Sequence, residues 1–170
     1  VRAIPEEGSS VGGKAYSFSG LTNSYLEIED GELLKEENVT IQAWVNTKME
    51  SRENGIIVQK PNNGTLMMFG GNPYFSWGGD YIKASTSIID KEFANITAVA
   101  TPDSLLLYVD GEKVEGGKRT GTFPSYTGGK VLIGKGFTGE IDEVRLWSRA
   151  LTAQEIANNY NAYLVGNEQG

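Results

Sequence analysis

One nine-residue segment, Val39–Thr47, constrains the fold more than any other part of the sequence. Four alternate positions are apolar, and the positions between them are polar apart from Trp44: the apolar set is Val39, Ile41, Ala43 and Val45. Alternation with a period of two is typical of a β-strand that packs one face on a core. We therefore predict a strand here, with Gln42 and Trp44 on the face turned away from the core.

Short β-prone segments recur along residues 15–147, and the turns between them are rich in glycine, of which the chain has 22. Asp110-Gly111, between two apolar runs, is a typical two-residue hairpin turn. About a dozen short strands in one chain predict an all-β fold, an antiparallel β-sandwich of two sheets. We expect residues 1–13 to be a flexible N-terminal segment and residues 14–170 to form the single domain.

Local chemistry predicts one short helix near the C-terminus. Thr152 and Glu155 have the spacing of a capping box, in which each side chain binds the backbone N–H of the other residue. Leu151 precedes the cap and Ile156 lies at the fourth helical position, so the two can form a hydrophobic staple. A short C-terminal helix should therefore close the sandwich.

The composition excludes several functions. The chain has no histidine and no cysteine, which removes the commonest general base, the Ser-His-Asp arrangement, disulfides and most zinc sites. Any metal would need oxygen ligands, which favours calcium. The net charge of −7 argues against a general nucleic-acid partner.

No stretch approaches the roughly 20 apolar residues that span a bilayer, so we expect no membrane insertion. No secretory leader is recognisable. Because residue 1 is Val, we expect the chain to be a mature or excised fragment.

Four motifs, in order along the chain, resemble the laminin-G-like, concanavalin A-like jelly-roll domains of the lectin and glucanase type. They lie at residues 13–28, 39–45, 107–111 and 137–156, and they include a Trp strand (VTIQAWV), a hairpin (LYVDG) and the ending FTGEIDEVRLW. Ser19 stands where the family's first motif has an aspartate. The resemblance implies a jelly-roll sandwich from a secreted, cell-surface or virion protein, and many such domains bind carbohydrate.

The resemblance also raises a catalytic alternative, because related glucanases carry their acids on one strand as E-x-D-x-E or with one inserted residue. Here Glu140 and Asp142 would share a strand face with position 144, which is Val, and position 145 is Arg. The second glutamate is missing in either spacing, and hydrolysis needs two carboxylates that flank the bond. We therefore predict no catalytic residues and no enzyme activity.

A structural calcium ion is a further implication of the resemblance, since related jelly rolls hold one with an aspartate near the place of Asp142. We expect Asp142 on the same face as Val144 and Leu146, at the mouth of the core. Asn23 in the loop after the first strand is the second candidate ligand. The alternative is that Asp142 binds backbone N–H groups, because that loop has no carboxylate.

Two groups of residues are candidates for ligand binding. Trp44 could offer its ring to the C–H face of a sugar, with Gln42 and Asn95 as polar neighbours. The alternative is that the C-terminal helix or a loop covers Trp44. The second group is aromatic and lies around glycine turns or in a long loop: Tyr74, Trp77, Tyr81 and Tyr126. The alternative for this group is packing beneath loops.

Together these features predict a non-catalytic recognition domain of an extracellular, cell-surface or virion protein. The expected partner is a glycan or cell-surface polysaccharide. The alternatives are a structural or adhesive module that contacts protein and has no sugar site, and a glycoside hydrolase.

Overall fold

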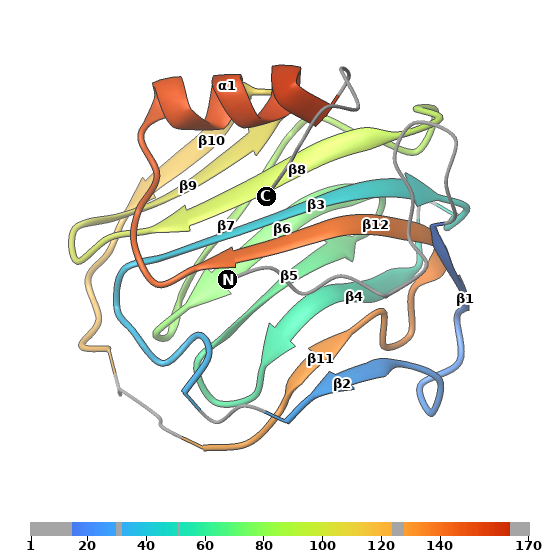
Figure 1. The fold of residues 1–170 in the computed structure, drawn as a ribbon, viewed down its shortest axis with the longest axis horizontal. Coiled ribbons are helices and arrows are strands. Elements are labelled where there is room, and N and C mark those ends of the chain that lie inside the picture. Colours follow the sequence, from blue (N-terminus) through green and yellow to red (C-terminus); the bar gives the residue numbers. More distant parts are fainter. Residues whose placement is uncertain (1–14, 30–31, 51, 124–127, 164–170) are drawn as a thin grey trace.

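The computed structural model describes residues 15–29, 32–50, 52–123 and 128–163 of the chain. These residues form two six-stranded antiparallel sheets that pack face to face, with one helix outside them (Figure 1). The prediction of an all-β jelly-roll sandwich closed by a short C-terminal helix is thus confirmed. The expected N-terminal segment, residues 1–13, lies outside the described residues.

Sheet A has the strand order β1-β12-β3-β8-β9-β10. Its strands are β1 (Tyr16–Ser19), β12 (Thr138–Trp147), β3 (Val39–Thr47), β8 (Ala94–Ala100), β9 (Ser104–Val109) and β10 (Glu112–Lys118). The hairpin between β9 and β10 turns at Asp110 and Gly111, whose φ angles of 52° and 82° are those of a type I′ turn. The predicted two-residue turn is therefore confirmed.

Sheet B has the strand order β2-β11-β4-β5-β6-β7. Its strands are β2 (Leu26–Ile28), β11 (Val131–Ile133), β4 (Asn54–Lys60), β5 (Gly64–Phe69), β6 (Asn72–Trp77) and β7 (Asp80–Lys83). The core lies between the two sheets. The apolar set of β3 faces it, as do Leu66 and Met68 of β5 and Phe75 of β6, all of them almost inaccessible to solvent.

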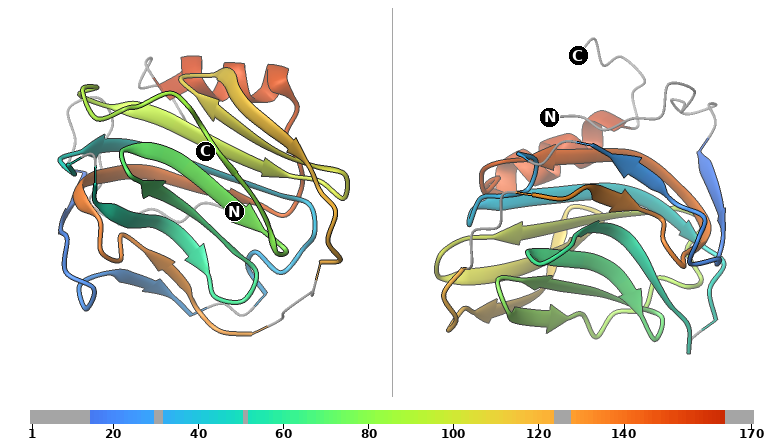
Figure 2. Two further views of the ribbon diagram at one scale, coloured as in Figure 1. Left: turned by 180° about the vertical axis from the view of Figure 1, so that it is seen from behind. Right: turned by 90° about the horizontal axis from the view of Figure 1, so that it is seen from below.

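The helix α1 (Ala153–Tyr163) lies on the outer face of sheet A, as the right-hand view of Figure 2 shows. Its capping box has formed, because the Glu155 N–H donates to Thr152 Oγ1 (3.2 Å) and the Thr152 N–H donates to Glu155 Oε2 (2.8 Å). Leu151 and Ile156 pack with Val99 and Tyr108 of sheet A in a small second core. Local capping and this apolar contact together dock the helix on the sheet.

The strand β12 departs from the regular alternation that we expected. Asp142 pairs with Trp44 while Arg145 pairs with Gln42, so residues 143 and 144 together oppose a single residue of β3. This is a β-bulge, and Glu143 takes the left-handed φ of 49°. Asp142 therefore lies on the outer face of sheet A, whereas Val144 points into the core. The expectation that Asp142 shares a face with Val144 is wrong.

Candidate functional site

The first predicted group of ligand-binding residues lies beneath α1. We call Gln42, Trp44 and Asn95 the helix-covered strip; their side chains are 1%, 5% and 0% exposed. The Trp44 ring stacks on Tyr160 of α1, with 5.5 Å between ring centroids and 20° between planes. The alternative in which the helix covers Trp44 is thus the one observed, and in this conformation no sugar can reach the ring.

The polar members of the strip bind one another. Gln42 Nε2 donates to Thr97 Oγ1 (2.9 Å) and to Asn95 Oδ1 (3.3 Å), and Thr97 Oγ1 donates to Asn95 Oδ1 (3.2 Å). Buried polar groups favour partners inside the protein. The three hydrogen bonds supply partners within sheet A, and among the described residues Asn95 Nδ2 is one of few buried side-chain atoms without one. The helix-covered strip is therefore part of the packed structure rather than a binding surface.

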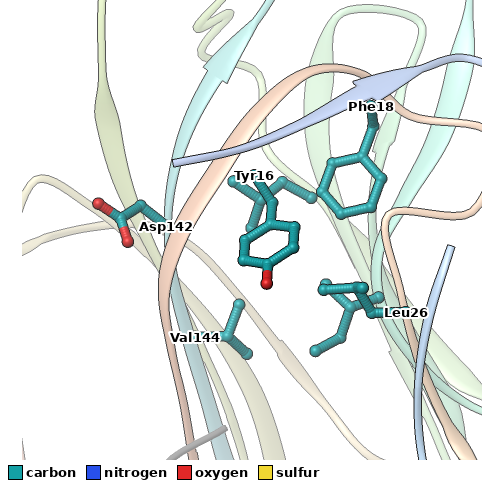
Figure 3. Close-up of a pocket in the computed structure, with 7 residues that line it drawn as sticks. Tyr16, Phe18, Leu26, Asp142 and Val144 are labelled. Atoms are coloured by element: carbon teal, nitrogen blue, oxygen red, sulfur yellow. The ribbon is translucent and has the colours of Figure 1, made fainter. Parts of the chain in front are cut away.

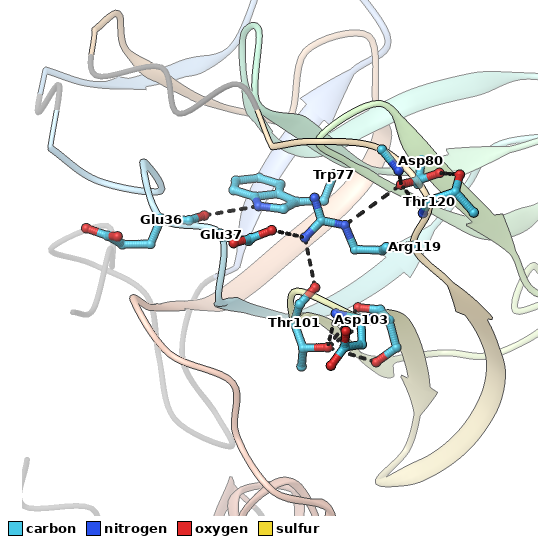
Figure 4. Close-up of polar contacts among 10 residues, drawn as sticks. Glu36, Glu37, Trp77, Asp80, Thr101, Asp103, Arg119 and Thr120 are labelled. Atoms are coloured by element: carbon cyan, nitrogen blue, oxygen red, sulfur yellow. Dashed lines mark hydrogen bonds and ion pairs between the residues drawn. The ribbon is translucent and has the colours of Figure 1, made fainter.

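Trp77, from the second predicted group, also lies in the interior. It is 0% exposed, it stacks between Phe75 and Phe123, and its Nε1 donates to the Glu36 carbonyl oxygen (3.1 Å; Figure 4). Alternation along β6 explains this, because Trp77 shares the inner face with Phe75 while Tyr74 shares the outer face with Ser76. Trp77 is thus a core residue and not a ligand platform.

The outer face of sheet B carries three aromatic side chains in a diagonal row across β5, β6 and β7. We call Phe69, Tyr74 and Tyr81 the aromatic ladder. Phe69 and Tyr74 have ring centroids 5.6 Å apart, and Tyr74 and Tyr81 have centroids 5.5 Å apart at 21° between planes. Phe69 is 43% exposed and Tyr81 is 67% exposed. The structure therefore brings together the predicted Tyr74 and Tyr81 on an accessible surface.

Polar side chains border the aromatic ladder in an order that the strand register fixes. Thr65 is opposite Ser76, and Ser76 is opposite Tyr81, so hydroxyl groups from three strands form one row. Gln59 of β4 extends this row, because its Nε2 donates to Thr65 Oγ1 (3.2 Å). Lys83 lies directly opposite Tyr74. Apolar ring surface next to hydroxyl and amide groups is the composition that binds sugar rings.

Tyr74 is the central ring of the ladder and the most enclosed. Burial raises the pKa of the Tyr74 phenol, and the neighbouring Tyr81 phenol raises it further, although a hydrogen bond with Ser76 acts in the opposite direction. Both effects disfavour the phenolate, so the ring is a neutral hydrogen-bonding group at neutral pH. Tyr74 is therefore suited to hydrogen bonding and ring contact, and not to acid–base chemistry.

A polar anchor holds β7, which carries Tyr81 and Lys83. The Asp80 carboxylate accepts hydrogen bonds from the Gly121 N–H (3.0 Å), the Thr120 N–H (3.1 Å) and the Thr120 hydroxyl (3.0 Å; Figure 4). These donors, the Gly121 N–H first, hold the pKa of Asp80 below its usual value. The buried Arg119 lies beside Asp80 and donates to the Thr101 carbonyl oxygen (2.8 Å). Thus the edge strand of sheet B is fixed at its start.

Sequence reasoning missed Phe69, and it grouped Trp77 wrongly. Phe69 follows two methionines in a run where both faces are apolar, so the period could not tell which side is outside. The alternation of Tyr74, Phe75, Ser76 and Trp77 could have separated Tyr74 from Trp77. Tyr126 lies outside the described residues.

The predicted calcium ligands do not come together. β1 pairs with β12 so that Ser19 is opposite Thr138 and Tyr16 is opposite Ile141, which places Asn23 beyond one end of the pairing and Asp142 at the other. Asp142 is four positions after Thr138 along the strand, which is about 13 Å at roughly 3.3 Å per residue. Figure 3 shows the Asp142 carboxylate on the far side of β12 from Tyr16 and Val144.

The donor set near Asp142 does not fit calcium either. Asp142 Oδ1 accepts the Glu143 N–H (2.8 Å), and among the residues that the structure describes no three His, Cys, Asp or Glu side chains form a group that could hold a metal. Calcium needs about six to eight oxygen ligands. The separation of Asp142 and Asn23 thus argues against one calcium ion bound by both residues, and calcium binding by the protein stays untested.

The acids of β12 are engaged with neighbouring side chains. Glu143 accepts two hydrogen bonds from Arg145 (3.0 and 3.2 Å), and Glu140 accepts one from Asn46 Nδ2 (3.0 Å). Asp142 and Glu143 are only 4% and 6% exposed. The burial of Asp142 and the two hydrogen bonds that Glu143 accepts from Arg145 leave these carboxylates poorly placed to flank a glycosidic bond, which argues against hydrolysis on this strand.

Comparison with known structures supports the fold. The binding domain of Paraclostridial Mosquitocidal Protein 1 is similar at 16% identity and a TM-score of 0.69, over 96% of this chain and 47% of that one. The receptor-binding domain of botulinum neurotoxin type G gives 15% identity and a TM-score of 0.68 over 95% and 46%. The chain spans about half the length of these structures, so their similarity concerns fold alone.

A third solved structure is that of botulinum neurotoxin type C, a toxin whose cell entry is described as dependent on interaction with two ganglioside molecules. It is 12% identical with a TM-score of 0.68, and the match again covers 95% of this chain and 46% of that one. No curated protein sequence matches the chain. Among the described residues, no helix has the length and apolar character needed to cross a membrane.

A family model matches most of the sequence. It covers residues 19–157, from β1 to the middle of α1, and it is the model of the concanavalin A-like lectin/glucanases superfamily. All four motifs that predicted this family fall wholly or largely inside that range. The chain therefore belongs to the concanavalin A-like lectin/glucanases superfamily.

Proposed function

We propose that this protein is a non-catalytic carbohydrate-recognition domain and that the aromatic ladder on sheet B is its binding platform. The observation that carries the proposal is the exposure of Tyr81 and Phe69 on either side of Tyr74. Large aromatic side chains rarely lie exposed in a group unless they bind something. The matching family includes both lectins and glucanases, and the receptor-binding role printed for the type G toxin domain supports recognition.

The geometry of the ladder suits sugar rings. A centroid separation of 5.5 Å is longer than that of a direct face-to-face stack, so the rings are offset and part of each face stays uncovered. Pyranose C–H groups pack on such faces, while the hydroxyl row of Thr65 and Ser76 can bind sugar hydroxyls. A rigid sheet holds these groups in place, which lowers the ordering cost of binding.

We further propose an extracellular, cell-surface or virion-surface location, because glycans and surface polysaccharides are displayed there. The similarity to toxin binding domains supports this setting. The alternative, a protein-contacting module, would use the same exposed face, and the experiment below separates the two.

The test is a glycan array followed by calorimetry, with wild-type protein and two variants. Tyr81→Ala removes the most exposed ring of the ladder, and we expect it to weaken binding about tenfold or more, which corresponds to about 1.4 kcal/mol. Phe93→Ala is the matched control, because Phe93 is an exposed aromatic (37%) outside the ladder, and it should bind as wild type.

Two results would contradict the proposal. Absence of binding across a broad panel of glycans would favour the protein-contacting module. Equal weakening by Tyr81→Ala and Phe93→Ala would show that the ladder has no special role. Thermal unfolding of each variant checks that the fold is intact, since substitutions at exposed positions change stability by only about 0.5 kcal/mol.

A further inference from the structure

Lys83 adds a positive charge to the aromatic ladder. Its side chain is exposed, it lies opposite Tyr74 in the strand register, and its Nζ is 4.8 Å from the centroid of the Phe69 ring. An ammonium group at this distance from an aromatic ring is attracted by the ring face, by about 0.5–1 kcal/mol at exposed sites. The contact holds the charge above the ladder.

Lys83 also differs from those surface cations of this acidic protein that carboxylates neutralise. Lys130 binds Glu27 (2.6 Å) and Glu29 (3.0 Å), Arg149 binds Glu155 (2.8 Å), and Lys91 binds Asp110. Within the described residues, Lys83 has its ring contact and no ion pair. Its charge is thus available to a ligand that lies on the ladder.

The acidic side chain closest in sequence does not compete for this charge. Asp80 lies on the opposite face of β7 and binds Thr120 and Gly121. The net charge of −7 repels an anionic ligand at long range, but salt screens that repulsion beyond about 8 Å at physiological ionic strength. Close to the ladder, the charge of Lys83 therefore decides which ligands are favoured.

We propose that the aromatic ladder binds a hexuronate-containing polysaccharide, with a sugar carboxylate on Lys83 Nζ and sugar faces on Tyr74 and Tyr81. This inference rests on the proposed carbohydrate-binding function and names the ligand class for the same site. An ammonium group forms short, charge-assisted hydrogen bonds with a carboxylate, which are about twice as strong as hydrogen bonds between neutral groups. Because the ladder crosses three strands, an extended chain fits it better than a single terminal sugar does.

The experiment is isothermal calorimetry with matched probes in which the sugar carboxyl group is either a charged carboxylate or a neutral methyl ester. The acidic probes are oligogalacturonate and oligomannuronate, the neutral probes are their methyl esters, and 3′-sialyllactose tests whether a terminal acidic sugar suffices. We expect wild-type protein to bind at least one acidic oligomer about tenfold or more tightly than its ester, which corresponds to about 1.4 kcal/mol.

Variants of Lys83 then assign that preference. Lys83→Met keeps an unbranched apolar chain and should abolish the preference for acid over ester, whereas Lys83→Arg keeps the charge and should retain most of it. Lys113→Met is the matched control, because Lys113 is exposed on β10 of the other sheet, and it should leave the preference unchanged.

Each contrary outcome has a distinct meaning. Equal affinity for acid and ester, or an unchanged preference in Lys83→Met, would overturn the hexuronate inference while Tyr81→Ala still tests the platform. Binding of sialyllactose without binding of either hexuronate oligomer would overturn it in favour of a terminal acidic sugar. Failure of every glycan to bind would overturn the proposed function itself.

Discussion

The outer faces of the two sheets carry similar side chains but differ in how far solvent can reach them. The face of sheet A carries Trp44 among amide and hydroxyl groups, and the face of sheet B carries Tyr74 and Tyr81 among amide and hydroxyl groups. On sheet A the helix α1 covers Trp44, which is 5% exposed, whereas Tyr81 on sheet B is 67% exposed. Composition alone therefore does not identify a binding surface, because a single covering element decides which aromatic side chains a ligand can reach.

The largest expected effect is a difference in the free energy of unfolding between variants of the two faces. Trp44→Ala removes a buried ring that packs on Tyr160, and it should lower the free energy of unfolding by about 3–5 kcal/mol. Tyr81→Ala should change it by only about 0.5 kcal/mol, because Tyr81 is exposed. Urea denaturation followed by circular dichroism measures both.

The same two variants should show the reverse order in ligand binding. Folded Trp44→Ala protein, assayed below its unfolding transition, should bind glycan with the affinity of wild type. Tyr81→Ala protein should bind glycan more weakly than wild type. Weakened binding by folded Trp44→Ala protein would place part of the ligand site on sheet A and would erase the distinction between the faces.

Sequence patterns predicted the elements whose cause is local. The alternation of Val39, Ile41, Ala43 and Val45 identified the core face of β3, and the Thr152 and Glu155 pair identified the start of α1. Neither pattern says what lies above Trp44, because that depends on where a helix more than 100 residues later docks. The burial of the helix-covered strip depends on tertiary packing, which sequence periodicity does not predict.

Two other differences also have physical causes that the sequence hides. The bulge in β12 depends on a left-handed φ of 49° at Glu143, a residue type that rarely adopts it, so nothing in the motif predicted that Asp142 would change faces. Sequence reasoning missed Lys83 because a single lysine in a charged chain gives no signal of its own. Its importance depends on the strand register that places it opposite Tyr74. Register therefore determines the site, and local composition supplies only its candidates.

The effect of intermediate size is a pH dependence of stability, and it concerns only α1, the helix that covers sheet A. The Arg149 guanidinium beside Glu155, with help from the Thr152 N–H, holds the pKa of Glu155 at about 2, below its ordinary 4.5. The unfolded chain therefore takes up a proton before the folded protein does. The stability that this carboxylate contributes is present above about pH 4.5 and is lost as the pH falls toward 2.

Glu155→Gln removes this titration and tests it. Between pH 6 and pH 3, the Tm of the variant should fall less than the Tm of wild type, by a margin well below the effect of Trp44→Ala because the ion pair is exposed. Glu112→Gln, on the exposed strand β10, is the matched control and should follow wild type. An equal fall in Glu155→Gln and wild type would show that α1 docks without this pair.

The smallest expected effect concerns calcium and the outer face of sheet A, where Asp142 lies. An ion at 100 times its Kd would stabilise the protein by about 2.7 kcal/mol and would raise the Tm by several degrees. Because Asp142 and Asn23 lie at opposite ends of the pairing between β1 and β12, we expect calcium and EDTA to give the same Tm within about 1 °C, measured by differential scanning calorimetry.

Asp142→Asn makes this test specific to the predicted ligand. The variant keeps an oxygen that can accept the Glu143 N–H, so its fold should be preserved while the charge that calcium needs is removed. A calcium-dependent rise of the Tm in wild type that disappears in Asp142→Asn would contradict our expectation and would restore Asp142 as a ligand. The covered face of sheet A would then carry an ion site, and the contrast between a structural face and a binding face would no longer hold.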